Sequence, residues 1–382
     1  MKLHPLLLAA VCAWFPISNP AVAEESRYPI LPIGSKAPDF KLPGVDGKNY
    51  SIEDFSKAKI LAIIFTCNHC PTAQAYEERI KKLVEDYKSR GVAVVGVNPN
   101  SSAGVRFDEL GYTDLDDTFE SMKIRAEDRK FNFPYLDDGE TEAFAKKLGP
   151  VATPHVFIFD ADRVLRYQGR IDDSEREEFV KSRDTRNALD ALLAGKIPPV
   201  QETKVFGCST KWDYKTDSNT RWMEKVRKEP VKLQAVSAEE LKALRANKSG
   251  KVRLVNFWAT WCGPCVSEFD DLIETNLRFR HRDFEMVTVA AQFPDEKDQV
   301  LRFLQKHFAS TTNYYFGETD KYKMIEAFDP KWSGALPHTL LIAPNGEVLY
   351  RETGELNMLE LRRKIYPALN RITPWPGMSS AQ

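Results

Sequence analysis

The chain has 382 residues, 42 % hydrophobic and 29 % charged, which is enough for two ordinary domains with packed cores and a soluble surface. Its formal net charge is −1, so the composition gives no indication of a nucleic-acid partner. No apolar run beyond the N-terminus is long enough to cross a bilayer, and we expect no transmembrane span in the mature chain.

The first 23 residues have the pattern of a secretory signal. A short apolar run over residues 6–15 is followed by an Ala-x-Ala pattern that ends at Ala23. We therefore predict cleavage after Ala23 and an exported mature protein, periplasmic or extracellular. An alternative is a lipoprotein attached through Cys12, although Val11 stands where a small residue is expected.

The first domain is predicted to cover residues 24–194. It begins with a hairpin near residues 34–47, and the apolar run 59–65 then predicts a buried strand. This strand leads into Cys67 and Cys70, which are two residues apart. Further predicted elements are a helix over 76–87, a buried strand over 92–97, a helix near 118–130, two strands after Pro154 and a closing helix over 183–193.

A polar connector is predicted over residues 195–230, and it contains a lone cysteine, Cys208. The second domain is predicted over residues 231–372, with a tail over 373–382. Its first helix begins after Ser237, where Glu240 completes a capping-box pattern.

The second domain repeats the order of strand, cysteine pair, helix and strand. The apolar run 252–258 predicts a buried strand, and apolar residues recur at helical spacing after Cys265. Cys262 and Cys265 therefore lie where a strand leads into a helix. Pro337 precedes a strand in this copy as Pro154 does in the first, so the chain contains an internal repeat.

The position of the pair predicts its chemistry. Unpaired N–H groups and the positive end of the helix dipole favour an anion, so Cys262 should ionise more easily than a free thiol. Gly263 and Pro264 allow Cys265 to reach Cys262 in a small disulfide ring and to resolve a mixed disulfide with another protein.

The segment around Trp261, the Cys-Gly-Pro-Cys motif and Glu268 resembles the thioredoxin superfamily, and within it the TlpA/ResA-type branch. The resemblance implies an α/β fold with a central mixed β-sheet flanked by helices. It also implies a glutamate, here Glu268, that tunes the cysteine pair and transfers protons. Cis peptide bonds at Pro154 and Pro337, facing the cysteines, are a further implication.

The first domain resembles the peroxiredoxin-like redoxins of the AhpC/TSA group, through segments such as FTCNHCPTAQAYEERI, TPHVFIFD and RYQGRIDD. The whole chain thus resembles two thioredoxin-like folds in tandem. Ala152 is a departure, because related sequences often carry another cysteine there. A Gly-Cys tail like Gly207-Cys208 also follows the domain in this group.

Four interpretations of the two cysteine pairs compete. Zinc binding needs four ligands around one ion, for which pairs so far apart are poorly placed. A structural disulfide across two residues closes too small a loop to stabilise much. Redox exchange needs this short gap. Peroxidase chemistry at Cys70 remains an alternative, although Cys67 stands where the peroxiredoxin motif has threonine. A copper site formed by Cys67, Cys70 and a histidine is a further alternative.

His69 stands directly before Cys70. A cation at a helix N-terminus should stabilise the thiolate, expected at Cys67, and so favour the dithiol over the disulfide. We hypothesise that the first pair has the higher reduction potential and that electrons pass from the second domain to the first. The alternative is a solvent-facing His69 with slight influence. His155 and His338 are expected to be packing or surface residues.

The sequence therefore predicts an exported thiol–disulfide oxidoreductase without a cofactor or metal. Its catalytic residues would be Cys67, Cys70, Cys262 and Cys265, and its partners protein disulfides or dithiols and an electron donor or acceptor such as a membrane thiol–disulfide reductase. Cys208 could be a relay thiol, an intermolecular link or inert. The rival hypothesis is a non-enzymatic module that holds a protein partner or copper.

Overall fold

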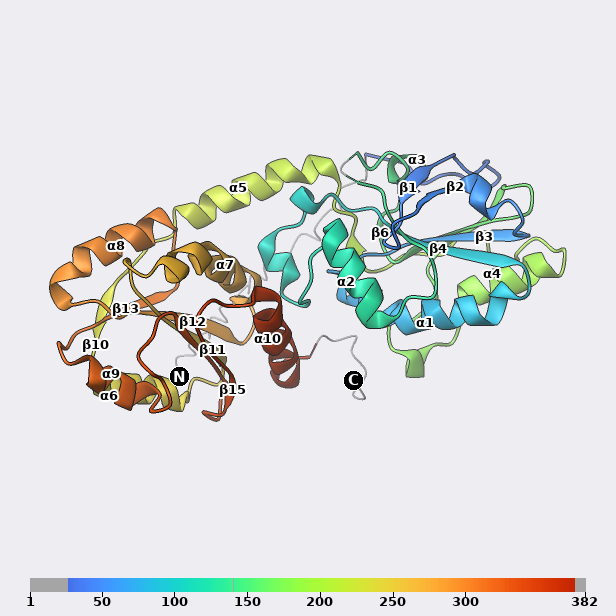
Figure 1. Ribbon diagram of the computed structural model, residues 1–382. Helices are drawn as coiled ribbons and strands as arrows, with labels where there is room; N and C mark the ends of the chain where they lie inside the picture. The colour runs from blue at the N-terminus through green and yellow to red at the C-terminus, as the bar shows by residue number, and fades with distance from the viewer. Residues whose placement is uncertain (1–26, 140, 375–382) are drawn as a thin grey trace, which may run out of the picture.

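A computed structural model describes residues 27–139 and 141–374. The predicted signal with its Cys12 alternative, and the tail beyond residue 374, lie outside the described residues. Two lobes lie side by side, joined by a long helix (Figure 1). No described helix has the length and apolar character that a membrane crossing requires.

The first lobe is built on a five-stranded mixed sheet with the order β5-β4-β3-β7-β8. β3 pairs in parallel with β4 and antiparallel with β7. The elements are β1 (Lys41–Pro43), β2 (Asn49–Ser51), β3 (Ile60–Phe65), α1 (Pro71–Lys88), β4 (Val92–Asn98), α2 (Phe119–Arg129), β5 (Tyr135–Asp137), α3 (Ala145–Leu148), β6 (Ala152–Thr153), β7 (His155–Phe159), β8 (Leu165–Gly169) and α4 (Asp184–Leu193), with short 3₁₀ turns at residues 52–55, 102–104, 107–110 and 177–179.

Alternate residues of β3 fill cores on the two faces of this sheet. Ile60 and Ile64 join one core with α1 and α4, whereas Leu61 and Ile63 join the other with α3. All six residues of β3 are buried, as the uninterrupted apolar run predicts. Each fully buried Leu or Ile contributes about 1.5–3 kcal/mol, so this strand is held rigidly beneath the cysteine loop that follows it.

The second lobe has a six-stranded mixed sheet with the order β10-β13-β12-β11-β14-β15. Its elements are β10 (Gln234–Val236), α6 (Ala238–Ala246), β11 (Val252–Trp258), α7 (Gly263–Phe279), β12 (Phe284–Ala290), α8 (Lys297–Lys306), β13 (Thr312–Phe316), α9 (Lys321–Phe328), β14 (His338–Ile342), β15 (Val348–Thr353) and α10 (Met358–Ile372), with a 3₁₀ turn at residues 294–296.

Helices cover both faces of this second sheet. α7, α8 and α10 contribute to the core on one face, and α6 and α9 contribute to the core on the other. The two lobes thus confirm the predicted fold class of two thioredoxin-like α/β folds in tandem. The predicted capping box is also present, since Ser237 caps α6 together with Glu240.

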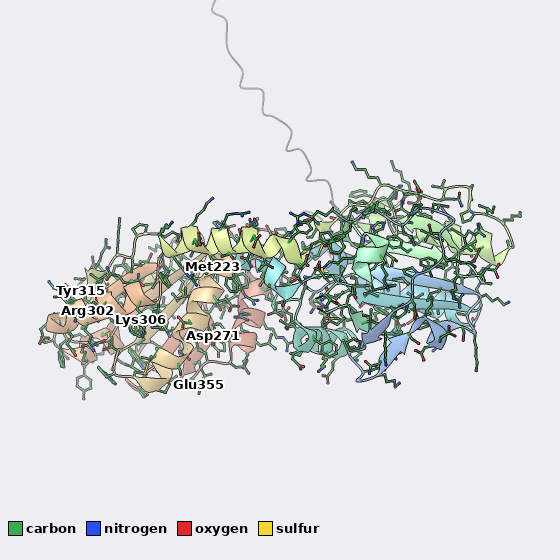
Figure 2. The ribbon with its side chains drawn as sticks, turned by 90° about the horizontal axis from the view of Figure 1, so that it is seen from above. Met223, Asp271, Arg302, Lys306, Tyr315 and Glu355 are labelled. Atoms are coloured by element: carbon green, nitrogen blue, oxygen red, sulfur yellow. A yellow bond between two sulfur atoms is a disulfide. The ribbon has the colours of Figure 1, made fainter. Side chains whose placement is uncertain are left out.

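The connector has more structure than its polar composition indicates. It contains β9 (Cys208–Ser209), a 3₁₀ turn at 213–215 and α5 (Thr216–Arg227). α5 spans the two lobes along one side (Figure 1), and Met223 lies over the second lobe, where it packs against the core (Figure 2). Apolar residues of α5 are therefore used for docking on the second lobe.

Polar contacts also join the lobes directly. Arg282 donates to the Gly111 carbonyl over 3.0 Å, and the Arg363 guanidinium lies 3.1 Å from an Asp114 carboxylate oxygen. Because α10 carries Arg363 and lies at the junction (Figure 1), it braces the second lobe against the enlarged loop region of the first.

Candidate redox centres at the two helix N-termini

The strand that leads into each cysteine pair has the same neighbour in both lobes. Phe65 of β3 pairs with His155, and Phe257 of β11 pairs with His338. The two pairings are antiparallel, and in each the histidine directly follows the proline. Phe65 and Phe257 are therefore equivalent, and the two lobes correspond at an offset of 192 positions in this strand.

The same offset places Cys70, and not Cys67, on Cys262. Each of these two residues caps its helix: Cys70 Sγ accepts from the Ala73 N–H over 3.4 Å, and Cys262 Sγ accepts from the Cys265 N–H over 3.3 Å. Cys67 and Cys70 therefore do not occupy the positions of Cys262 and Cys265 relative to the helix. Pro71, at the first position of α1, is the sequence signal that could have located the cap at Cys70.

The second centre holds a disulfide between Cys262 and Cys265, with a Cα–Cα distance of 5.2 Å. Both sulfur-bearing residues are buried, but Gly263 and Pro264 are exposed and Trp261 is 66 % exposed. An exposed indole beside a buried disulfide gives a visiting polypeptide an apolar surface to pack against.

Both prolines that precede β7 and β14 follow cis peptide bonds, as the resemblance implied. Cys70 Sγ lies 3.2 Å from the carbonyl oxygen of Thr153, which precedes Pro154, so the proline loop does face the first centre. In the second lobe the residues before Pro337 differ in environment: Leu336 is half-buried and Ala335 is exposed.

Glu268 lies on α7, one turn after Cys265, and is 4 % exposed. One carboxylate oxygen accepts from the Leu356 N–H over 2.9 Å, and the other has no hydrogen-bond partner among the described residues. Burial raises the pKa of Glu268 to about 7, and the charges of Glu355 and Asp271 act in the same direction. A carboxyl group with this pKa can take up or release a proton near neutral pH.

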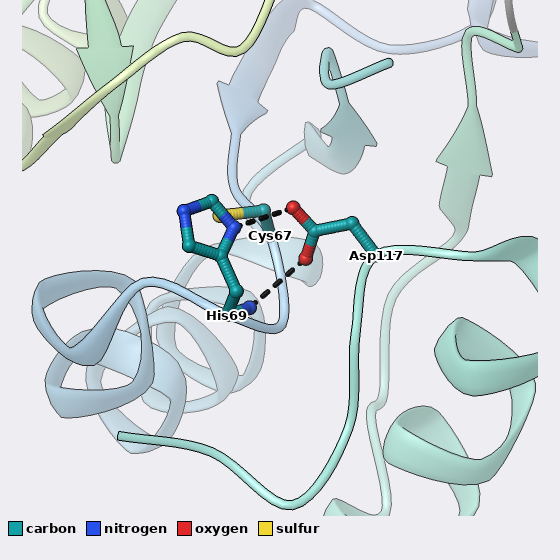
Figure 3. Close-up of side chains that lie close together, drawn as sticks. All are labelled: Cys67, His69 and Asp117. Atoms are coloured by element: carbon teal, nitrogen blue, oxygen red, sulfur yellow. Dashed lines mark hydrogen bonds and ion pairs between the residues drawn. The ribbon is translucent and has the colours of Figure 1, made fainter. Parts of the chain in front are cut away.

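His69 is buried, so the solvent-facing alternative is wrong. Its Nδ1 lies 2.5 Å from an Asp117 carboxylate oxygen, and its backbone N–H donates to the other oxygen of Asp117 over 2.9 Å (Figure 3). Burial alone would lower the pKa of His69, but the Asp117 charge and hydrogen bond raise it. Protonation of His69 is therefore favoured relative to a free imidazole.

Asp117 is a site residue that the sequence did not single out. It lies 47 positions beyond Cys70, in the enlarged stretch between β4 and α2, where no motif marks it. Besides His69, the Asn68 N–H and the Asn100 side-chain amide donate to its carboxylate, over 2.9 and 2.7 Å. Burial would raise the pKa of Asp117, but these contacts and the His69 charge lower it, so the carboxylate stays ionised.

The thiolate of the first centre is assigned to Cys70. Burial would raise the pKa of Cys70, but hydrogen bonds from Cys208 and Cys67 and the His69 charge bring it well below its usual value. Burial, the hydrogen bond to Cys70 and the Asp117 charge raise the pKa of Cys67. The expectation that Cys67 carries the thiolate is therefore corrected, because Cys70 occupies the helix N-terminus.

A third sulfur belongs to the same centre. Cys208 packs against the small cluster formed by Cys67, Cys70 and Ala73, and its backbone N–H donates to Cys70 Sγ over 3.3 Å. The hydrogen bond to Cys70, together with burial, raises the pKa of the Cys208 thiol.

One group of side chains has donor atoms suited to a metal ion. Cys67 Sγ, His69 Nδ1 and an Asp117 oxygen lie within 4.8 Å of one another. The 2.5 Å separation between His69 and Asp117 is that of a shared proton, shorter than the spacing of two atoms that bind one ion. The arrangement present is a charge-assisted hydrogen bond, and it fits thiol chemistry better than metal binding.

The two histidines after the prolines are buried in the structure. His155 lies 2.9 Å from the Gln168 side-chain oxygen, and His338 contacts Thr353 and Asp329. Burial lowers the pKa of each to about 4, so both are neutral at physiological pH. These contacts agree with the expected packing role.

The fold and the cysteine centres define a tandem protein of the thioredoxin-like redoxin class. Residues 33–168 match the AhpC/TSA family, and residues 228–363 match the Redoxin family. The chain therefore belongs to these families, with one domain of each in tandem, as the sequence resemblance implied.

Curated relatives are thiol–disulfide exchange proteins. Over 129 residues the chain is 28 % identical to the thiol:disulfide interchange protein CycY of Rhizobium leguminosarum bv. viciae, a match to 32 % of this chain and 60 % of CycY. Over 137 residues it is 30 % identical to the thiol-disulfide oxidoreductase ResA of Bacillus thuringiensis, a match to 35 % of this chain and 69 % of ResA. The chain thus spans less than two thirds of the length of CycY.

Among solved structures, a hypothetical protein of Sinorhizobium meliloti 1021 is 31 % identical in the aligned part. The alignment covers 49 % of this chain and 98 % of that one, with a TM-score of 0.43.

Proposed function

We propose that this chain is an exported thiol–disulfide oxidoreductase whose second domain exchanges disulfides with protein substrates. The observation that carries the proposal is the cysteine pair at the N-terminus of α7, present as a disulfide next to an exposed Trp261. The relatives named as exchange proteins support the same activity.

The reaction begins with the reduced pair. The Cys262 thiolate, stabilised by the helix N-terminus, attacks one sulfur of a substrate disulfide, and the other substrate sulfur leaves as a thiolate. A mixed disulfide then joins Cys262 to the substrate. Pro337 shapes the groove in which the substrate strand lies.

The second step releases the substrate. Glu268 accepts the proton of Cys265, and the Cys265 thiolate attacks Cys262 Sγ, so that the substrate leaves as a dithiol and the 262–265 disulfide forms. Two electrons have passed to the substrate. A reductant, such as a membrane thiol–disulfide reductase, must return them for another turnover, and electron flow in the opposite direction would make the same centre an oxidant.

The Cys262→Ser variant of the full mature chain should lose catalysis of insulin reduction by dithiothreitol, because the attacking sulfur is absent. Cys265→Ser should instead accumulate a mixed disulfide with the substrate, visible on a non-reducing gel. Ser267→Ala, an exposed change on the same turn of α7, serves as the matched control and should keep the wild-type rate. A wild-type rate in Cys262→Ser would contradict the proposed exchange activity. Detection of a secreted chain that begins at Glu24 would support the proposed export of the protein.

A further inference from the structure

The connector crosses the first centre as a short strand. β9 pairs antiparallel with β6, so that Cys208 lies opposite Thr153 and Ser209 lies opposite Ala152. Thr153 is the residue before the cis peptide bond at Pro154. A segment of this chain therefore adds a strand to the proline loop, in the manner of a peptide that binds a sheet edge.

Gly207 is required for this close approach. Its φ is +137°, and a Cβ added there would lie 2.1 Å from the Thr153 carbonyl oxygen. Only glycine fits between the connector and the proline loop without moving one of them. The local sequence is thus adapted to hold Cys208 at this position.

The second centre has no such cover among the described residues. Ala335 is exposed and Leu336 is half-buried, whereas Ala152 and Thr153, before the equivalent proline, are both buried beneath the connector. In the second domain, an external strand can reach the proline loop. In the first domain, the connector already occupies the equivalent loop.

The occupying strand brings a thiol to the reactive sulfur. Cys70 is fully buried and receives hydrogen bonds from the thiols of both Cys67 and Cys208. Cys70 is thus the central sulfur of three, with one neighbour on its own loop and the other on the connector.

We propose that Cys208 is a redox partner of Cys70, so that Cys70 forms a disulfide with either Cys67 or Cys208 and the connector is the internal substrate of the first centre. The proposal rests on the thiol–disulfide exchange chemistry proposed above. It extends that chemistry to a cysteine that lies outside both Cys-x-x-Cys motifs.

The exchange between the two disulfides balances without an external oxidant. Starting from the 67–70 disulfide, the Cys208 thiolate attacks Cys70 Sγ, the bond between Cys67 and Cys70 breaks, and Cys67 leaves with the electron pair and takes up the proton that Cys208 lost. Thr153 Oγ1 lies 3.1 Å from Cys67 Sγ and can donate a hydrogen bond to the departing thiolate. The reverse attack by Cys67 frees Cys208.

A disulfide of a second molecule is needed to enter this cycle from the reduced state. With oxidised glutathione, the Cys70 thiolate takes one glutathione sulfur and releases one glutathione thiolate. Cys208 or Cys67 then attacks Cys70 Sγ and displaces the second glutathione as a thiolate. Two protein thiols are thereby oxidised, and one molecule of oxidised glutathione is reduced.

Disulfide mapping in the full mature chain tests the proposal. Reduced protein is exposed to oxidised glutathione, quenched with acid, alkylated and digested. Cys67→Ser should yield a peptide with a 70–208 disulfide, Cys208→Ser should yield the 67–70 disulfide, and Cys70→Ser should yield neither. Cys67→Ser with glutathione on Cys70 and an alkylated Cys208 would overturn the proposal.

The same digest separates this proposal from the proposed function. The 262–265 disulfide is read in each sample, so a chain whose second centre fails to exchange is recognised independently of the first centre. Melting temperatures of the variants identify any that do not fold, and the Gly207 variant below gives a test that keeps all the cysteines.

Gly207→Ala should separate the connector from the proline loop. We expect alkylation of Cys208 in the reduced protein to accelerate about tenfold or more, because the new Cβ must open the strand pairing, and the 70–208 disulfide to be lost. Gly195→Ala is the matched control, since Gly195 also has a positive φ, +72°, but no atom within 4 Å of the added Cβ. An unchanged yield of the 70–208 disulfide in Gly207→Ala would overturn the placement of Cys208.

Discussion

Replacing His69 by Gln should raise the pKa of the Cys70 thiol and slow its alkylation at neutral pH. The reason is that the charge of protonated His69 is one of the causes that hold the pKa of Cys70 below its usual value. The rate of alkylation of Cys70 in the reduced full chain, followed by peptide mass spectrometry against pH, measures this change.

His155→Gln is the matched control for this variant. His155 is also a buried histidine of the first lobe, but its pKa of about 4 leaves it neutral, and its contacts are with Gln168 and the Val151 N–H. The pKa of Cys70 should therefore stay at its wild-type value. An equal shift in both variants would show that general loosening of the lobe, and not the charge of His69, is responsible.

The same variant tests the order of the two reduction potentials. A stabilised thiolate favours the dithiol and makes the disulfide more oxidising, so the first pair should have a higher potential than the second, and His69→Gln should lower it. Differential alkylation of the full chain in glutathione buffers gives both values. A potential at the first pair equal to or below that of the second would contradict the proposed passage of electrons from the second domain to the first.

Replacing Glu268 by Gln should remove the part of the pH–rate profile of substrate release that rises through about pH 7. Glu268 acts as a proton acceptor for Cys265 only when it is ionised, and its pKa is about 7. The decay of a mixed disulfide preformed on Cys262, measured by rapid quench between pH 5 and 9, isolates this step. A rising limb at the same pH in Glu268→Gln would exclude Glu268 as the proton acceptor.

Two conservative variants provide a graded control. The charges of Glu355 and Asp271, which Figure 2 labels in the second lobe, raise the pKa of Glu268. Glu355→Gln and Asp271→Asn should therefore shift the limb to lower pH without removing it. Because removal of a negative charge lowers the pKa of a thiol as well as that of a carboxyl, the loss of the limb in Glu268→Gln, and not this shift, assigns the limb to Glu268.

The raised pKa of Glu268 also predicts how the free energy of unfolding changes with pH. Its pKa in the folded chain is raised above the unfolded value, so its contribution to the free energy of unfolding is fully present below about pH 4.5 and is lost as the pH rises through about 7. We expect a loss on the order of 3 kcal/mol, because each pKa unit between the folded and unfolded values corresponds to about 1.4 kcal/mol. Glu268→Gln should lack this loss in urea titrations across the same pH range.

The elements that form the second centre follow directly from local sequence patterns. Three features depend only on residues close together in the sequence: the uninterrupted apolar run of β11, the helical spacing after Cys265 and the short gap between the cysteines. Each is found where it was predicted. The predicted helix near 118–130 is likewise confirmed as α2, with Thr118 as its cap. The domain boundaries stay predictions.

The first centre was harder to predict because two cysteines with the same spacing can lie in two registers relative to the helix. The spacing predicts that Cys67 and Cys70 lie close together. Which of the two caps the helix depends on the residue at which the helix begins. That start depends on the length of the loop after β3, which the strand pairing fixes. The one local signal, Pro71 directly after Cys70, is easily overlooked beside the more familiar Cys-x-x-Cys pattern.

The amino-acid sequence by itself determined the two redoxin folds, the cysteine pair of the second domain and the prolines that precede β7 and β14, because these depend on residues close together along the chain. Only the tertiary structure decided that Asp117 raises the pKa of His69, that the pKa of Cys70 is lowered and that Cys208 lies against Cys70. These contacts join residues 48 and 138 positions apart, and no local periodicity encodes which distant loop a folded sheet will bring over a helix N-terminus.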